Sequence, residues 1–214
     1  MYDLGDVLPD LSFDPGSNVL VSGPPLTGKR RIALEILAAG TADDEGVIVV
    51  TTKDSAEKVL SQYGDMVGNE QIPIGIVDCV TEQRGVESVD DPRVKYASSP
   101  VDMTGIGINL SEYLQEFYEH RGFERNRVLL HSVSTLLMYS NLETVFRFLH
   151  VFTGRIQSAD ALGVHVIDST AHDDRTLQVL KQAFDSLVEV REQDGQRQAR
   201  VRGPRTEPTD WHRI

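Results

Sequence analysis

One stretch of the sequence decides the fold class: Asn18-Val19-Leu20-Val21-Ser22-Gly23-Pro24-Pro25-Leu26-Thr27-Gly28-Lys29-Arg30. It begins with a short apolar run that predicts a buried strand, and residues 31–39 after it have the pattern of a helix. Between strand and helix lies the pattern GxxxxGK, in which glycines let backbone N–H groups surround phosphate oxygens. The first turn of the helix adds unpaired donors and the positive end of its dipole. We therefore expect the loop 23–30 to bind phosphate groups, with Lys29 reaching the outer ones.

Strand-like and helix-like runs alternate along the chain, which is typical of parallel βαβ units. Predicted strands are 19–22, 47–52, 72–80, 94–97, 127–133 and 163–167. Predicted helices are 31–39, 55–63, 110–120, 142–156 and 175–184, and segments 82–92 and 98–108 are interpreted as surface connections. Residues 187–191 and 199–202 flank a turn at Asp194-Gly195, which is the signature of a hairpin. We expect a single α/β domain over 1–214, with a mostly parallel sheet flanked by helices and a C-terminal β-hairpin and tail over 186–214.

The composition is acidic, with 33 acidic and 21 basic residues and a net charge of −12. This balance argues against general affinity for nucleic acids and is typical of proteins that stay soluble in a salt-rich cytosol. No run approaches the roughly 18 apolar residues of a membrane span, and the N-terminus has no signal-like segment. We therefore expect a cytoplasmic protein without a membrane partner. Cys79 is the only cysteine and the six histidines lack ligand spacing, so no metal cluster is expected.

Segments 16–54 and 127–137 resemble the RecA/KaiC class of P-loop ATPases, in particular archaeal KaiC/GvpD-like proteins. The run Gly16-Ser17-Asn18-Val19-Leu20-Val21-Ser22-Gly23-Pro24-Pro25 resembles the KaiC entry into the phosphate loop. The run Arg127-Val128-Leu129-Leu130-His131-Ser132-Val133-Ser134-Thr135-Leu136-Leu137 resembles that family's Walker B strand. The tail Arg200-Val201-Arg202-Gly203 is similar to a basic hairpin that, in that family, reaches the nucleotide of the neighbouring subunit. The resemblance implies a RecA-like fold, ATP as the ligand and a homo-oligomer, and together with the acidic composition it implies a halophilic archaeal source.

Three positions depart from the pattern of this family. Arg30 stands where a Ser or Thr hydroxyl would ligate Mg²⁺, and arginine cannot ligate a cation. His131 stands where the Walker B aspartate would be, and Thr52-Lys53-Asp54 stands where the family has its catalytic glutamate. Nucleotide hydrolysis needs a metal to hold the phosphates and a base to orient water, so both parts of the machinery are impaired. Asp54 remains a candidate base of shorter reach.

A charge count suggests one interpretation of these departures. A lysine, an aspartate and Mg²⁺ together carry two positive charges, and so do Lys29, Arg30 and a neutral His131. Arginine can bind phosphate through two parallel hydrogen bonds. In this interpretation Arg30 replaces the metal, and the protein binds ATP without Mg²⁺ and hydrolyses it slowly or not at all. The alternative is that Arg30 points to solvent and the site has drifted to inactivity.

Two further groups of residues are candidates for a role in the site. Asp168 follows the strand 163–167, where ligands of open α/β sheets bind, so it is a candidate to sense the outermost phosphate or to orient water. The alternative is that it belongs to a helix N-cap region before Asp173. Arg200 and Arg202 are candidate fingers that contact phosphate across a subunit interface. The alternatives for this basic patch are a nucleic-acid contact and an edge hairpin that its charge protects from aggregation.

The function expected from these features is nucleotide binding, with ATP as the ligand, in a regulatory switch that acts on an unknown protein partner and hydrolyses ATP weakly or not at all. One alternative is an active ATPase that assists DNA recombination or repair, with Asp54 as its base. Another is an interaction scaffold whose loop no longer binds nucleotide. The departures at Arg30 and His131 favour the switch and the scaffold over the active ATPase, and whether the protein is an enzyme stays open.

Overall fold

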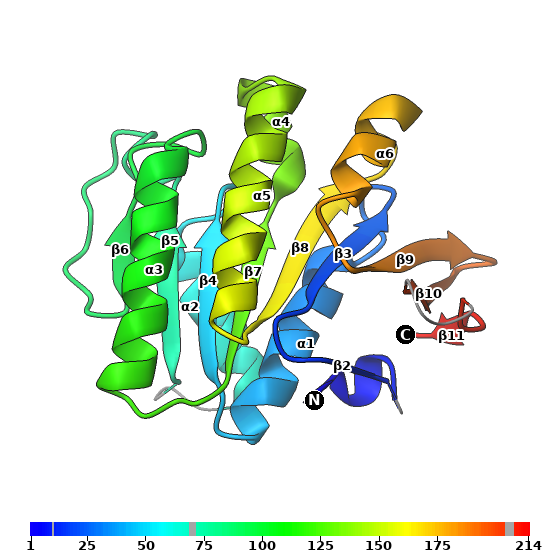
Figure 1. The fold of residues 1–214 in the computed structure, drawn as a ribbon, viewed down its shortest axis with the longest axis horizontal. Coiled ribbons are helices and arrows are strands. Elements are labelled where there is room, and N and C mark those ends of the chain that lie inside the picture. Colours follow the sequence, from blue (N-terminus) through cyan, green and yellow to red (C-terminus); the bar gives the residue numbers. More distant parts are fainter. Residues whose placement is uncertain (10, 69–71, 204–207) are drawn as a thin grey trace.

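A mostly parallel sheet forms the centre of the molecule (Figure 1). The computed structural model describes residues 1–9, 11–68, 72–203 and 208–214. Within this described part, the strand order of the sheet is β11-β10-β9-β3-β8-β7-β4-β5-β6. Its strands are β3 (Asn18–Gly23), β4 (Gly46–Thr51), β5 (Ile74–Asp78), β6 (Val94–Tyr96), β7 (Asn126–His131), β8 (Leu162–Asp168), β9 (Ser186–Gln193), β10 (Gln196–Arg202) and β11 (His212–Arg213). Neighbours from β9 to β6 are parallel, and β10 and β11 extend the sheet in antiparallel fashion beyond β9.

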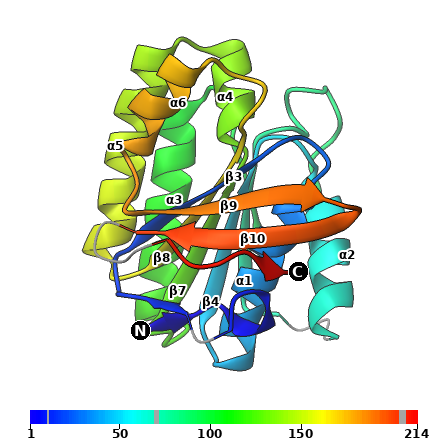
Figure 2. The ribbon, with the colours of Figure 1, turned by 90° about the vertical axis from the view of Figure 1, so that its right-hand side faces the viewer.

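Helices cover both faces of this sheet (Figure 1 and Figure 2). One face packs against α1 (Lys29–Ala42) and α2 (Ala56–Val67). The other packs against α3 (Met103–Glu119), α4 (Val133–Tyr139), α5 (Leu142–Ser158) and α6 (Asp174–Lys181). Side chains alternate along each strand, so Val47 and Val49 of β4 enter the first core while Ile48 and Val50 enter the second. Burial on both faces explains why the central strands are continuous apolar runs in the sequence.

A short N-terminal unit lies beside α1, near the amino ends of the parallel strands (Figure 1). It consists of β1 (Tyr2–Asp3), a 3-10 turn η1 (Gly5–Val7) and β2 (Ser12–Phe13), and β1 pairs with β2 in antiparallel fashion. Tyr2, Leu4 and Leu8 bury their side chains in the first core. No pattern in the sequence indicates this unit, because strands of two residues are too short to show a period.

The predicted α/β class, the parallel sheet flanked by helices and the C-terminal antiparallel hairpin are confirmed. The hairpin turn has the predicted chemistry, since Asp194 and Gly195 have φ angles of 53° and 71°. Both residues therefore adopt the left-handed conformation that a tight two-residue hairpin turn requires. Residues 204–207 of the predicted tail lie outside the described residues.

The prediction that the segment 98–108 is a surface connection is wrong for its second half, because α3 begins at Met103. Asp102 caps this helix, since its side chain accepts a hydrogen bond from the amide of Gly105 at 2.9 Å. Gly107 lies inside this helix, and Nη1 of Arg155 on α5 donates to its carbonyl oxygen. A contact between α3 and α5 therefore forms at this glycine despite its low helix propensity.

The predicted strand 127–133 is too long at its carboxyl end. β7 ends at His131, and α4, which the sequence analysis did not predict, begins at Val133. The side chain of Ser132 accepts from the amide of Thr135 and so caps α4. The apolar run continues from strand to helix without a break, which is why its period did not reveal the boundary.

Candidate phosphate-binding site

The loop 23–30 joins the carboxyl end of β3 to the first turn of α1, as predicted. Leu26 and Gly28 have φ angles of 65° and 87°, and these two left-handed residues turn the chain into the helix. The hydroxyl of Thr27 donates to the carbonyl oxygen of Pro24 at 2.8 Å, which closes the loop from inside. Lys29 is only 5% exposed. The loop therefore holds its lysine inside the molecule rather than on its surface.

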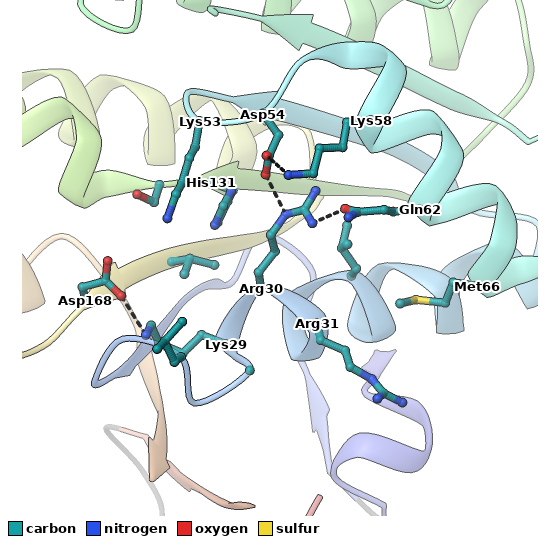
Figure 3. A pocket seen from close by; sticks show the side chains of 15 residues that line it. Lys29, Arg30, Arg31, Lys53, Asp54, Lys58, Gln62, Met66, His131 and Asp168 are labelled. Atoms are coloured by element: carbon teal, nitrogen blue, oxygen red, sulfur yellow. Dashed lines mark hydrogen bonds and ion pairs between the residues drawn. The ribbon is translucent and has the colours of Figure 1, made fainter. Parts of the chain in front are cut away.

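Lys29 is paired with Asp168 at the end of β8 (Figure 3). The two residues meet because β3 and β8 are neighbours in the sheet, with Gly23 opposite Asp168. The ammonium Nζ lies 2.8 Å from Oδ1 of Asp168. The backbone amide of Asp168 donates to Oγ of Ser134 at 2.9 Å, and Nε2 of His172 lies 2.9 Å from the same hydroxyl. The structure thus brings together two residues that the sequence nominated separately, and Asp168 neutralises the charge of Lys29.

The side chain of Arg30 turns toward α2 and away from Lys29 (Figure 3). Its Nε lies 3.3 Å from Oδ2 of Asp54, and its Nη1 donates to Oε1 of Gln62. The carboxylate of Asp54 also accepts a hydrogen bond from Lys58 at 2.5 Å. Arg30 is therefore paired within the chain rather than directed to solvent. The candidate base Asp54 is paired with both Arg30 and Lys58.

The charges around Asp54 weaken it as a base. Partial burial raises the pKa of Asp54, but the hydrogen bond from Lys58 and the charge of Arg30 outweigh burial and leave the pKa below its ordinary value. A general base is most effective when its pKa lies near the working pH. Asp54 is therefore ionised at neutral pH, but it is better suited to an ion pair than to proton abstraction.

His131 lies at the end of β7, beside Thr51 of β4, and its side chain is buried. Burial, reinforced by the charge of Arg30, lowers the pKa of His131 to about 4. The imidazole is therefore neutral at pH 7, as the charge count assumes. A neutral ring gives a metal ion no negative charge at the position where the resemblance implies an aspartate.

A cavity of about 560 Å³ lies between the loop 23–30, α2 and the ends of β7 and β8 (Figure 3). Basic side chains outnumber acidic ones in its lining, although the chain as a whole is acidic. The basic residues are Lys29, Arg30, Arg31, Lys53 and Lys58, and the acidic residues are Asp54 and Asp168. Three of the five lysines of the chain therefore line one cavity. Such a local excess of positive charge attracts an anionic ligand.

Sequence reasoning gave no role in this cavity to Lys53, Lys58 or Gln62. A signal for the last two was present, because Asp54, Lys58 and Gln62 are spaced four residues apart. Lys58 and Gln62 lie on the same face of α2, and Asp54 lies just before this helix, four residues from Lys58, so an ion pair of Asp54 with Lys58 was foreseeable. The approach of Arg30 from α1 was not, because it depends on how α1 and α2 pack together.

The hairpin arginines nominated as fingers are engaged within the chain. Nε of Arg200 and Nε of Arg202 lie 2.5 and 2.9 Å from Oε2 of Glu189. The guanidinium groups of Arg191 and Arg200 lie 3.9 and 4.4 Å from the ring centre of Trp211. These contacts bind β9, β10 and the C-terminal segment to one another, and a contact of Arg200 or Arg202 with a neighbouring subunit stays a prediction.

Two glycines of the loop are close to the same hairpin. A Cβ atom on Gly23 would lie 2.4 Å from the carbonyl oxygen of Val190, and one on Gly28 would lie 3.2 Å from Nη1 of Arg197. β9 and β10 therefore pack closely against the loop. Arg197, which the sequence analysis did not nominate, is a hairpin arginine that the structure places beside the phosphate loop.

Other candidate chemistry is sparse in the described ranges. Within residues 1–9, 11–68, 72–203 and 208–214, no group of three His, Cys, Asp or Glu side chains is arranged to hold a metal ion. In the same described part, no helix has the length and apolar character to cross a membrane. Cys79 is buried, and burial raises the pKa of its thiol, as expected for a small core residue.

Comparison with known proteins places the fold and the family. A crystal structure of an uncharacterized protein from Pyrococcus horikoshii, in complex with an unknown peptide, superposes with a TM-score of 0.71. The two sequences are 15% identical, and the match covers 95% of this chain and 94% of that chain, so the likeness concerns the fold alone. No curated protein matches the sequence. The model of DUF7504, a family of unknown function, matches residues 16–190, which include the loop 23–30, His131 and Asp168. This chain belongs to the DUF7504 family.

Proposed function

We propose that this protein binds ATP through the loop 23–30, as a RecA/KaiC-like P-loop protein, and works as a cytoplasmic regulatory switch with weak or absent hydrolysis. The observation that carries the proposal is the position of Lys29. This lysine is buried at the border of a cavity of about 560 Å³, beside the first turn of α1. Backbone amides at a helix start and a buried ammonium group are suited to phosphate oxygens.

The RecA-like part of the proposal is supported by the arrangement of the elements. The phosphate loop follows a strand inside a parallel sheet, and ligands of such sheets bind beyond the carboxyl ends of the strands. His131, Asp54 and Asp168 follow or end neighbouring strands at this same edge. The antiparallel hairpin of β9 and β10 adjoins β3, the strand that precedes the loop 23–30.

Weak hydrolysis is supported by the state of the two groups that hydrolysis needs. The end of β7 carries a neutral imidazole in place of a metal-binding carboxylate. The carboxylate of Asp54 is held by Arg30 and Lys58, and its pKa is lowered. Neither group is therefore set up to hold Mg²⁺ or to orient an attacking water.

Two alternatives make different predictions. An active ATPase that assists DNA recombination or repair would show turnover that DNA stimulates, and replacing Asp54 would abolish that turnover. A scaffold without nucleotide would keep the loop as part of its fold and would bind no phosphate. The ion pair of Asp54 with Arg30 disfavours the first alternative. Asp54 is the base that this alternative requires, and its carboxylate is held by a cation.

The test is calorimetric titration of ATP into the purified protein at high salt, once with Mg²⁺ and once with excess EDTA. Lys29→Ala is the control, since it removes the buried ammonium and leaves the loop backbone in place. Binding by the wild-type protein that the variant loses supports the proposal, and a turnover assay then measures hydrolysis. No binding in either condition refutes it and favours the scaffold. Rapid turnover that depends on Mg²⁺ and DNA favours the ATPase.

A further inference from the structure

Lys53 occupies a place in the cavity that none of the predicted roles explains. It lies two residues beyond the end of β4 and lines the same cavity as Lys29. In Figure 3 its side chain extends from the turn between β4 and α2 into the space bordered by His131 and Asp168. Within the described residues, the ion pairs at the cavity involve Lys29, Arg30 and Lys58 but not Lys53. Its charge is therefore available to a ligand.

The backbone that carries Lys53 is fixed before any ligand arrives. The amide of Thr52 donates to the carbonyl oxygen of His131 at 2.8 Å, and the amide of Ser132 donates to Oγ1 of Thr52 at 2.7 Å. On the other side, Arg84 donates to the carbonyl oxygen of Lys53 at 3.3 Å. These bonds tie the turn to the end of β7, so the lysine approaches the cavity from a defined direction.

The neighbouring cation Arg30 is less suited to a ligand. Asp54 and Gln62 hold its guanidinium on the α2 side of the cavity, so a phosphate would have to break both contacts to use it. No such contact has to break for Lys53. The imidazole of His131 between the two is neutral and neither attracts nor repels a phosphate strongly.

We propose that Lys53 binds the terminal phosphate of a nucleoside triphosphate, so that Lys29 and Lys53 hold this group from two sides without a metal ion. The inference rests on the proposed function and names the ligand class more narrowly. A cation stands in the segment Thr52-Lys53-Asp54 that follows β4, where the family resemblance implies a catalytic glutamate, and a cation there holds phosphate instead of activating water. Asp168 releases Lys29 as the phosphate takes its place.

This arrangement makes the protein sensitive to the number of phosphates. A diphosphate engages the loop and Lys29 but leaves Lys53 without a partner, whereas a triphosphate engages both lysines. Hydrogen bonds to charged groups contribute enough to separate the two ligands by about tenfold or more in affinity. A switch built in this way reads the presence of the third phosphate and does not need to hydrolyse it.

The test is calorimetric titration of ATP and of ADP in excess EDTA, with the wild-type protein and three variants. In Lys53→Met we expect the affinity for ATP to fall about tenfold while that for ADP stays the same. Lys53→Arg should restore most of the preference for ATP. Lys95→Met is the control, because Lys95 is paired with Glu112 and does not line this cavity, and it should keep the wild-type ratio. Thermal unfolding verifies that each variant is folded.

The outcomes separate the two proposals. A Lys53→Met variant that keeps the wild-type preference for ATP overturns the role of Lys53, and so does a wild-type protein that binds ATP and ADP equally well. ATP binding that requires Mg²⁺ overturns the metal-free arrangement. In each of these cases nucleotide binding itself stands. A wild-type protein that binds neither nucleotide refutes the proposed function and the inference with it.

Discussion

Two clusters of charged side chains lie at opposite ends of the same parallel sheet, and they differ in what surrounds them. At the amino ends of β4 and β7, Arg127 and Glu45 form an ion pair whose side chains are 0% and 1% exposed. At the carboxyl ends, Lys29 and Asp168 form an ion pair at the border of a cavity, and Asp168 is 31% exposed. We call Arg125, Arg127 and Glu45 the lower cluster. We call the charged residues that line the cavity the upper cluster, and these are Lys29, Arg30, Arg31, Lys53, Asp54, Lys58 and Asp168.

Protein groups accept hydrogen bonds from Nε and Nη1 of Arg127 in the lower cluster, whereas its buried Nη2 has no partner among the described residues. Nε of Arg127 donates to Glu45 at 2.5 Å, and its Nη1 donates to the carbonyl oxygens of Asp3 and Ile36 at 2.7 and 2.5 Å. Arg125 adds a second cation, 2.9 Å from the other carboxylate oxygen of Glu45. The cluster joins β7, the start of β4, α1 and the N-terminal unit, so its role is to hold these elements together.

The contrast teaches how to separate structural charge from functional charge in this fold. In the lower cluster the side chains of Arg127 and Glu45 are buried within the protein. The upper cluster opens on a cavity, contains more cations than anions, and keeps one ammonium, that of Lys53, out of its ion pairs. Enclosed charges should therefore govern the free energy of unfolding, and the open ones should govern ligand affinity.

The largest expected effect is on the lower cluster. Arg127→Met removes the buried partner of Glu45 and leaves this buried carboxylate with only the more exposed Arg125, which should cost about 3 kcal/mol of the free energy of unfolding. Denaturant-induced unfolding measures the loss. Arg125→Met keeps the buried pair and removes only the more exposed partner, so its loss should be about 1 kcal/mol or less. Equal and small losses in both variants would mean that the lower cluster is not a structural clamp.

The second prediction concerns the separation of stability from binding. Lys29→Ala removes a cation that is costly to bury, so the free energy of unfolding should change little, whereas ATP affinity should fall by about 1.5–3 kcal/mol. Unfolding and calorimetry on the same preparation measure both quantities. A Lys29→Ala protein that is destabilised as strongly as Arg127→Met would show that the upper cluster is also structural.

The third prediction concerns the pH dependence of stability that arises from His131, which lines the cavity. Burial lowers the pKa of His131 to about 4 in the folded protein, below the ordinary value near 6.5. The unfolded chain therefore takes up a proton first as the pH falls, and stability is lost between about pH 6.5 and pH 4. From pH 6.5 to pH 5 the contribution of His131 is roughly 2 kcal/mol.

Replacing His131 isolates this contribution from other groups that titrate in the same range. Burial also lowers the pKa of His165, to about 3, so the wild-type protein loses stability in this window for two reasons. His131→Asn should lose less stability than the wild-type protein between pH 6.5 and pH 5, as measured by denaturant titrations at both values. Identical pH profiles would mean that the ring of His131 is not buried in solution.

The fold class and the strand–loop–helix arrangement around residues 23–30 could be predicted from the sequence because both depend on local patterns. The continuous apolar runs of the central strands and the glycines of the loop can be recognised without knowing what lies next to them. Asp168 was nominated by its place after a strand, and the structure confirms that place. The termini of α3 and α4 were missed because they depend on the cap residues Asp102 and Ser132, whose local signals compete with glycine and with a continuous apolar run.

The partners within the upper cluster could not be predicted, since they depend on how separate elements pack. The pairing of Arg30 with Asp54 requires α1 and α2 to lie side by side, and the pairing of Lys29 with Asp168 requires β3 and β8 to be neighbours. Neither adjacency follows from spacing in the sequence. The same holds for the lower cluster, where Glu45 and Arg127 are 82 residues apart.

The smallest expected effect, and the sharpest test of the difference between the clusters, is on Asp168. Its carboxylate competes with phosphate for Lys29 and also repels the phosphate charges, so Asp168→Asn should raise ATP affinity by about 1 kcal/mol, or roughly fivefold. The gain should be larger at low ionic strength, because salt screens this repulsion. Asp174→Asn, at the exposed start of α6, is the control and should leave ATP affinity unchanged.

The opposite result would assign Asp168 a different role. If ATP binds more weakly to Asp168→Asn, the carboxylate takes part in holding the ligand, as the prediction that it senses the outermost phosphate requires. In the lower cluster, by contrast, neutralising the carboxylate of Glu45 should lower stability, because its partners are the cations Arg125 and Arg127 of the protein itself. A gain in function on removing Asp168 would therefore distinguish an ion pair that a ligand displaces from one that only holds the fold together.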